Sequence, residues 1–278
     1  MSQSLLHTVS IFNADSPASV VKATQNGIHL TFLYDDLATR DPALIKAYQD
    51  NHMQVIDARP SGILAQQTNE ADYLTALKKH LEGIKDNPLI AGFWILDDWN
   101  LARGNARQWL IDAKTLIRQY SDKPVICGFG GDIGLNAKTF SWDDRLADNF
   151  SPQVCDYVAW YLYDGYWTGT HRASEFNWNM YGVLNAVSTS LKKRGWDIAK
   201  QPLIGIVQAF SDDHYLAPSA KNMTTQAKAY CAFGASAISY WTWGTGEGSG
   251  QSTFMTSNAV NNGIRQGIVA CQQIWAAK

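Results

Sequence analysis

Two adjacent carboxylates, Asp97 and Asp98, stand where a long apolar run of the sequence ends. Residues 89–96 are rich in Ile, Phe and Trp, which is typical of a strand buried on both faces. Because neighbouring residues of a strand point to opposite faces, at most one of the two carboxylates can point along the inner face. A carboxylate at the end of a buried strand can bind hydroxyl groups or transfer protons in general acid–base chemistry.

Strand-like segments alternate with helical patterns along the whole chain. We expect strands at residues 8–13, 28–34, 53–58, 89–96, 124–129, 157–163, 203–210 and 237–243. We expect helices at residues 19–25, 42–50, 71–84, 105–120, 178–194, 224–233 and 258–276. Alternation of this kind predicts a parallel sheet, and eight βα units predict an α/β protein with a single (β/α)8 TIM barrel, one domain over residues 1–278. An open doubly wound sheet would need a Gly-rich turn after an early strand, and the turns after the first two strands have no glycine.

The active site of such a barrel lies at the carboxyl ends of its strands. Those ends combine acidic and polar side chains with flat aromatic rings. The acidic and polar candidates beside Asp97 and Asp98 are Asp35, Asp57, Arg59, Asn100, Asp164 and Gln208. The aromatic candidates are Tyr34, Trp99, Tyr161, Tyr163, Trp241 and Trp243. Since sugar faces stack on aromatic rings and carboxylates bind hydroxyls, this combination predicts a carbohydrate or another small polar substrate.

The charge of the chain argues against two classes of partner. The formal net charge is -2 and the pI is about 6.3, with no basic patch. Nucleic acid and anionic membranes are therefore poor partners. No apolar run approaches the roughly 20 residues of a membrane span. We expect a monomer, although nothing in the sequence fixes the oligomeric state.

The four cysteines, Cys127, Cys155, Cys231 and Cys271, are far apart and form no CxxC motif. Three of them lie in apolar segments, where buried free thiols are the usual state. The first ten residues lack the basic and apolar regions of a signal peptide. Both observations favour a reduced, cytoplasmic protein, and secretion stays open if the sequence has been trimmed.

Motifs for other chemistries are missing. There is no HxH on the first strand, no HExxH and no GxSxG, and no strand carries an obvious Schiff-base lysine, so we expect no cofactor and no zinc site. The pairs Asp35/Asp36 and Asp97/Asp98 could bind Mg²⁺ through oxygen atoms. A metal-assisted hydrolase or lyase that uses an acidic ring around Asp35, Asp57 and Asp97 therefore remains an alternative.

Three segments resemble strands of the chitinase-like glycoside hydrolases, the family-eighteen type. Residues 92–100, GFWILDDWN, resemble that family's fourth strand, which ends in Asp-x-Asp-Trp-Glu-like carboxylates. Residues 155–165, CDYVAWYLYDG, resemble its sixth strand with a terminal Tyr-Asp pair. Residues 234–244, GASAISYWTWG, resemble its eighth strand, which places a Trp under the sugar. The resemblance implies a TIM barrel that hydrolyses O-glycosyl bonds.

The chain departs from that family at the catalytic position. Asn100 falls where the family carries its catalytic Glu, and an amide cannot serve as a general acid. The family's Gly-rich signature in the third strand is also absent. Either Asp97 or Asp98 has taken over as the acid, or hydrolysis has been lost. A second group, the α-galactosidase-like barrels, uses Asp at the ends of strands four and six, which Asp97 (or Asp98) and Asp164 match.

Two carbohydrate hypotheses follow. In the first, the protein is a retaining glycosidase in which Asp97 or Asp98 forms an acid–nucleophile pair with Asp164, about 5–5.5 Å apart. The aromatic candidates then hold the sugar, and Asp57, Arg59 and Gln208 bind its hydroxyls. In the second, the barrel binds carbohydrate without cleaving it, as the Asn100 substitution implies.

Overall fold

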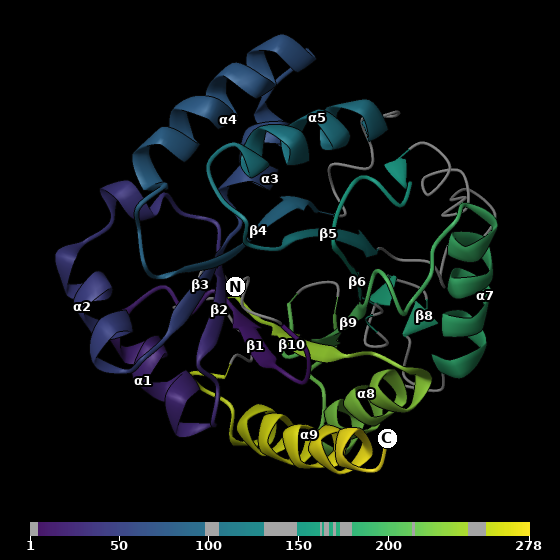
Figure 1. Cartoon of the computed structure of the whole chain (residues 1–278). Coiled ribbons are helices and arrows are strands. Elements are labelled where there is room, and N and C mark those ends of the chain that lie inside the picture. The colour runs from purple at the N-terminus through teal and green to yellow at the C-terminus, as the bar shows by residue number, and fades with distance from the viewer. Residues whose placement is uncertain are drawn as a thin grey trace.

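The computed structural model of the chain shows a ring of parallel strands surrounded by helices (Figure 1). It describes residues 5–97, 106–130, 149–161, 163, 167–168, 171–172, 180–212, 215–243 and 254–278. The N-terminal segment crosses one end of the ring: Leu5 is buried in the interior, and its N–H donates to the hydroxyl of Tyr157 at 3.2 Å.

The strands form a closed (β/α)8 barrel, which confirms the predicted fold. They are β1 (Val9–Phe12), β2 (Leu30–Leu33), β3 (Gln54–Asp57), β4 (Ile90–Leu96), β5 (Val125–Gly130), β6 (Tyr157–Tyr161), β9 (Leu203–Gln208) and β10 (Ala237–Trp241). Their order around the ring is β1-β10-β9-β6-β5-β4-β3-β2, and every neighbouring pair is parallel. A short antiparallel ribbon of β7 (Trp167–Thr168) and β8 (His171–Arg172) lies where the sequence pattern indicated a loop.

The helices agree with the predicted pattern with one addition. They are α1 (Pro17–Gln25), α2 (Pro42–Asp50), α3 (Arg59–Gln66), α4 (Glu70–Ile84), α5 (Arg107–Arg118), α7 (Met180–Lys193), α8 (Ala220–Phe233) and α9 (Asn258–Ala276), with a 3-10 turn η1 (Leu37–Thr39). The sequence pattern missed α3, because its Arg-Pro-Ser-Gly start is typical of a turn, yet Pro60 is tolerated in a first helical turn. None of the described helices has the length and apolar content of a membrane span.

Side chains alternate between two cores along each strand. Inside the ring pack Phe12, Phe32, Ile56, Trp94, Ile126 and Ile206. Between the ring and the helices pack Leu33, Val55, Ile95, Phe129, Trp160 and Val207. The interior is therefore a filled core, and a substrate can reach only the side chains at a rim of the barrel.

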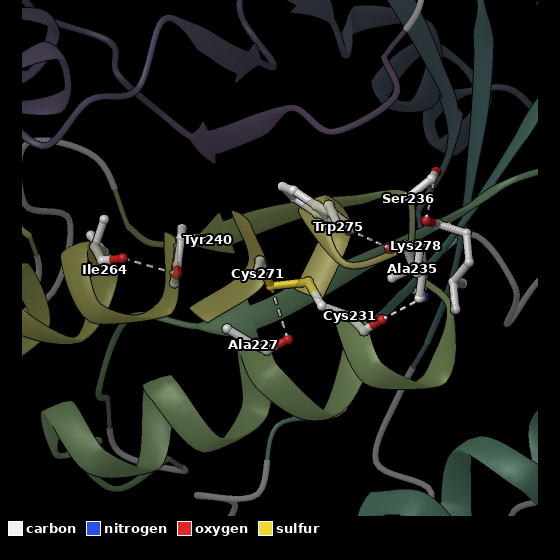
Figure 2. Close-up of a disulfide and its surroundings, with 10 residues drawn as sticks. Ala227, Cys231, Ala235, Ser236, Tyr240, Ile264, Cys271, Trp275 and Lys278 are labelled. Carbon is white, nitrogen blue, oxygen red and sulfur yellow. Dashed lines mark hydrogen bonds between the residues drawn. A yellow bond between two sulfur atoms is a disulfide. The ribbon is translucent and has the colours of Figure 1, made fainter. Parts of the chain in front are cut away.

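The expectation of unpaired cysteines is wrong for Cys231 and Cys271. Cys231 of α8 and Cys271 of α9 form a disulfide, as Figure 2 shows. Their Cα atoms are 5.5 Å apart. The two helices follow the last two barrel strands and pack side by side, an adjacency that a spacing of 40 residues conceals in the sequence. Trp275 of α9 donates its indole N–H to the carbonyl of Ala235 at 2.9 Å and ties α9 to the same region. Cys127 and Cys155 are free and buried, as expected.

Removing the disulfide should lower stability measurably. For a loop of 40 residues, the chain-entropy model gives a stabilisation of about 4 kcal/mol. We expect the double variant Cys231→Ala, Cys271→Ala to lose that much free energy of unfolding in urea denaturation. Thiol titration of the denatured wild-type chain is the control: two thiols should react before reduction and four after it. Four reactive thiols before reduction would contradict the pairing.

Candidate functional site

Asp97 lies directly after β4, and its carboxylate is enclosed by hydrogen-bond donors. The side chain is 3% exposed. One oxygen, Oδ1, accepts from the hydroxyl of Tyr161 at 2.6 Å. The other, Oδ2, accepts from the indole N–H of Trp94 at 3.0 Å and from the hydroxyl of Tyr34. Burial of a carboxylate is costly unless its oxygens are hydrogen-bonded, and these three donors meet that requirement.

A bulge in β4 turns Asp97 toward the interior. The register between β4 and β5 shifts between Trp94 and Leu96. Trp94 faces the inside of the ring while Leu96 packs in the outer core, although residues two apart share a face in a regular strand. Since a bulge changes which face the following side chains take, Asp97 points inward.

Two glycines of β5 provide the space for the donors to Asp97. A Cβ atom on Gly128 would collide with the ring of Trp94, and one on Gly130 would collide with the ring of Tyr161. Both rings therefore lie over the inner face of β5, where a side chain would otherwise stand. The site depends on the absence of side chains in β5 as much as on the donors themselves.

Aromatic rings line the same end of the barrel. The rings of Tyr161 and Tyr163 stack with centroids 5.7 Å apart. The ring centroid of Phe210 lies 5.2 Å from that of Tyr163 and 5.1 Å from that of Trp241. Trp241 packs edge-on against Trp243, with ring centroids 4.4 Å apart. The rings with partly open surfaces are Tyr34, Tyr163, Trp241 and Trp243. The structure thus brings together Asp97 and five of the six aromatic side chains that the sequence indicated.

Gln208 holds in place the segment that contributes Phe210 to these rings. We call the rings of Tyr34, Tyr161, Tyr163, Phe210, Trp241 and Trp243 the aromatic wall. The side chain of Gln208 is fully buried, and its amide N–H₂ donates to the carbonyls of Phe210 at 3.0 Å and Leu216 at 2.9 Å. These bonds fix the segment after β9, which carries Phe210 and Tyr215 against Tyr163. A role for Gln208 in binding sugar hydroxyls stays a prediction.

Asp57 faces away from Asp97. It lies on the outer face of β3 with Val55, it is 1% exposed, and its Oδ2 lies 2.7 Å from Nε2 of His80 on α4. Its Oδ1 accepts from the backbone N–H of Arg59 at 3.1 Å. The sequence reasoning did not connect His80 with the strand ends, because a helical pattern does not show which side chain of β3 a residue 23 positions further along will meet. Substrate contacts by Asp57 and Arg59 stay predictions.

The charge of His80 is set by opposing effects. Burial favours the neutral ring, but the hydrogen bond to Asp57 and the negative charges of Asp57 and Asp36 outweigh it, so the pKa of His80 is raised above its usual value. The nearby cation of Arg59 opposes this shift. His80 and Asp57 form a buried ion pair wherever His80 is protonated.

Asp35 lies on the surface. Its side chain is 55% exposed and forms an ion pair with Arg40. Since Asp35 pairs outside the ring and Asp57 faces the helices, these two carboxylates and Asp97 do not converge on one point. Within the described part of the chain, no group of three or more His, Cys, Asp or Glu side chains could hold a metal ion.

Several predicted site residues lie outside the described residues. They are Asp98, Trp99, Asn100 and Asp164. The proposed pairing of a fourth-strand carboxylate with Asp164 therefore stays a prediction.

Comparisons with known proteins show the fold alone. No family model matches the sequence, and neither does any curated protein. Among solved structures, active domain 2 of a chitinase from Pyrococcus furiosus is 13% identical with a TM-score of 0.61, over 98% of this chain and 97% of that one. An endo-beta-1,4-mannanase from Thermotoga petrophila is 10% identical with a TM-score of 0.55, over 95% and 76%. A GH113 beta-1,4-mannanase is 10% identical with a TM-score of 0.54, over 99% and 100%. The chain shares the TIM-barrel fold of these glycoside hydrolases.

The hydrogen bonds that Asp97 accepts should contribute measurably to the free energy of unfolding. Tyr161→Phe removes one donor from a buried carboxylate, and hydrogen bonds to charged groups contribute about 1.5–3 kcal/mol, so the free energy of unfolding should fall by that amount. Tyr73→Phe is the matched control, because Tyr73 is fully buried and its hydroxyl has no hydrogen-bond partner among the described residues. Chemical denaturation compares the two variants. Equal losses would show that the bond from Tyr161 to Asp97 adds nothing.

Proposed function

We propose that the protein is a glycoside hydrolase that acts on a carbohydrate at the carboxyl end of the barrel. One observation carries the proposal: a buried, hydrogen-bonded carboxylate, Asp97, lies beside a wall of partly open aromatic rings. Sugars present apolar faces to such rings, and a fixed buried carboxylate can stabilise the positive charge that develops on a sugar ring in the transition state. The location agrees with the place where TIM barrels keep their active sites. The names of the similar structures, a chitinase and mannanases, support the same class of substrate.

The surroundings of Asp97 limit the role that it can take. Both oxygens of Asp97 already accept hydrogen bonds, and the side chain is almost fully enclosed. Asp97 is therefore suited to stabilise positive charge on the sugar and to fix the two tyrosines, rather than to exchange protons. In our proposal, Asp98 and Asp164 perform the acid and nucleophile steps. One protonates the leaving oxygen while the other attacks the anomeric carbon, and water then releases the sugar.

A second candidate is a barrel that binds carbohydrate without cleaving it. The enclosure of Asp97 favours it, because a carboxylate whose two oxygens already accept hydrogen bonds is poorly suited to attack a sugar or to transfer a proton. Asn100, at the position of the family's catalytic Glu, points the same way.

Substitution of the three aspartates tests the hydrolase. Turnover of a panel that includes chitin and mannan oligosaccharides is measured by product chromatography. We expect Asp98→Asn and Asp164→Asn to lower kcat by about 10²–10⁴, as loss of acid–base or covalent catalysis does. Asp97→Asn should lower it by about 10²–10³, as loss of a fixed charge does. Asp50→Asn, an exposed carboxylate paired with Lys46 on α2, is the control and should not change kcat.

Calorimetry on the same panel separates the two candidates. Binding by the wild-type protein without any product would favour the binding barrel. Neither binding nor product across the panel would contradict both. Unchanged kcat in all three aspartate variants of an active enzyme would overturn the assignment of the aspartates alone.

The aromatic wall should contribute to affinity. Trp243→Ala removes a partly open ring that packs edge-on against Trp241 and Phe210. One aromatic stacking contact contributes about 0.5–1.5 kcal/mol to the binding free energy. Its loss should therefore weaken glycan binding by roughly 2- to 13-fold in calorimetry. Trp109→Ala is the matched control, because Trp109 is partly buried on α5 against Tyr73, outside the ring. Equal effects of the two substitutions would place the sugar elsewhere.

A further inference from the structure

A line of polar contacts runs from α4 to the carboxylate of Asp97. His80, whose side chain is 5% exposed, lies between two carboxylates. Its Nε2 is 2.7 Å from Oδ2 of Asp57, and its Nδ1 is 3.7 Å from Oδ1 of Asp36. Asp36 belongs to the segment that follows β2, two residues after Tyr34, whose hydroxyl bonds to Asp97. One short segment is thus attached to Asp97 at one end and to His80 at the other.

The protonation of His80 changes what it offers to Asp36. A protonated ring donates from both nitrogens, whereas a neutral ring has one N–H and one lone pair. The shorter contact keeps the remaining proton on Nε2, toward Asp57. Nδ1 then presents its lone pair to Asp36, so attraction to that carboxylate is replaced by repulsion.

Within the part of the chain that the structure describes, three elements present charged groups to His80. They are Asp57 from β3, Asp36 from the segment before η1, and Arg59 from the first turn of α3. The two carboxylates favour the charged ring, while Arg59 and burial oppose it. The carboxylates prevail, so the pKa of His80 is raised above its usual value, and the ring loses its charge as the pH rises through that pKa.

We propose that His80 is a positioning residue of the candidate site: its cationic form holds Asp36 and thereby keeps Tyr34 on Asp97, and its neutral form releases both. This inference rests on the proposed function in so far as it assigns a pH response to the same site. The coupling from His80 to Tyr34 can nevertheless be measured without any substrate.

NMR titration of the full chain tests the coupling. The ring signals of His80 and Tyr34 are assigned with His80→Gln and Tyr34→Phe and followed from pH 5 to pH 9. We expect Tyr34 to shift with the midpoint of His80. In Asp36→Asn, His80 should still titrate while Tyr34 loses that shift. Asp35→Asn is the matched control, because Asp35 pairs with Arg40, and it should keep the coupling.

Two results would overturn the inference. One is a Tyr34 signal that does not move while His80 titrates. The other is a shift of Tyr34 that is the same in Asp36→Asn as in the wild type. If His80→Gln does not fold, Asp36→Asn still decides, because its side chain is partly exposed and its removal leaves the bond from His80 to Asp57 in place.

Stability and activity give independent readings. Because the folded state raises the pKa of His80, protonation of His80 stabilises the folded protein. This contribution is complete below the pKa of histidine in the unfolded chain, about 6.5, and is lost as the pH rises through the pKa in the folded state. Wild-type stability should therefore fall more than that of His80→Gln over this range. If a glycan is turned over, its rate should fall with the same midpoint in the wild type but not in Asp36→Asn. Failure of every glycan would contradict the proposed function, whereas the NMR coupling alone decides the role of His80.

Discussion

The carboxylate of Asp97, almost completely removed from water, is the constraint around which this end of the barrel is built. Burial of an ionised group without donors costs several kcal/mol. Its three donors among the described residues come from three places in the chain: after β2, within β4 and at the end of β6. Strands that are distant in sequence must therefore be closed into a ring before the carboxylate is satisfied. The site and the barrel form together.

The donors impose a second constraint on the packing. A barrel interior holds only a few side chains in each layer, and protein interiors are close-packed. The indole of Trp94 and the phenol of Tyr161 occupy space over β5, which is possible because Gly128 and Gly130 contribute no side chain there. Any other residue at these positions would push a donor away from Asp97. The glycines are thus as much a part of the site as the rings.

The sequence predicts the barrel well because each strand is an apolar run bounded by turn residues. For the candidate site, the sequence indicates strand-end side chains but not the direction in which each one points. The inward turn of Asp97 depends on a bulge that no sequence pattern reveals. Strand alternation turns Asp57 toward α4, and its role in binding substrate stays a prediction. The disulfide of Cys231 and Cys271 was missed because it depends on two helices being neighbours in space.

The two buried strand-end carboxylates are stabilised in chemically different ways, and the difference has a functional consequence. Among the described residues, the donors of Asp97 are two phenols and an indole. Asp57 is instead matched by a histidine, which changes charge within reach of that range. Since the segment from Tyr34 to Asp36 connects the two, a response to pH at Asp97 would start at His80 and reach Asp97 through the position of Tyr34.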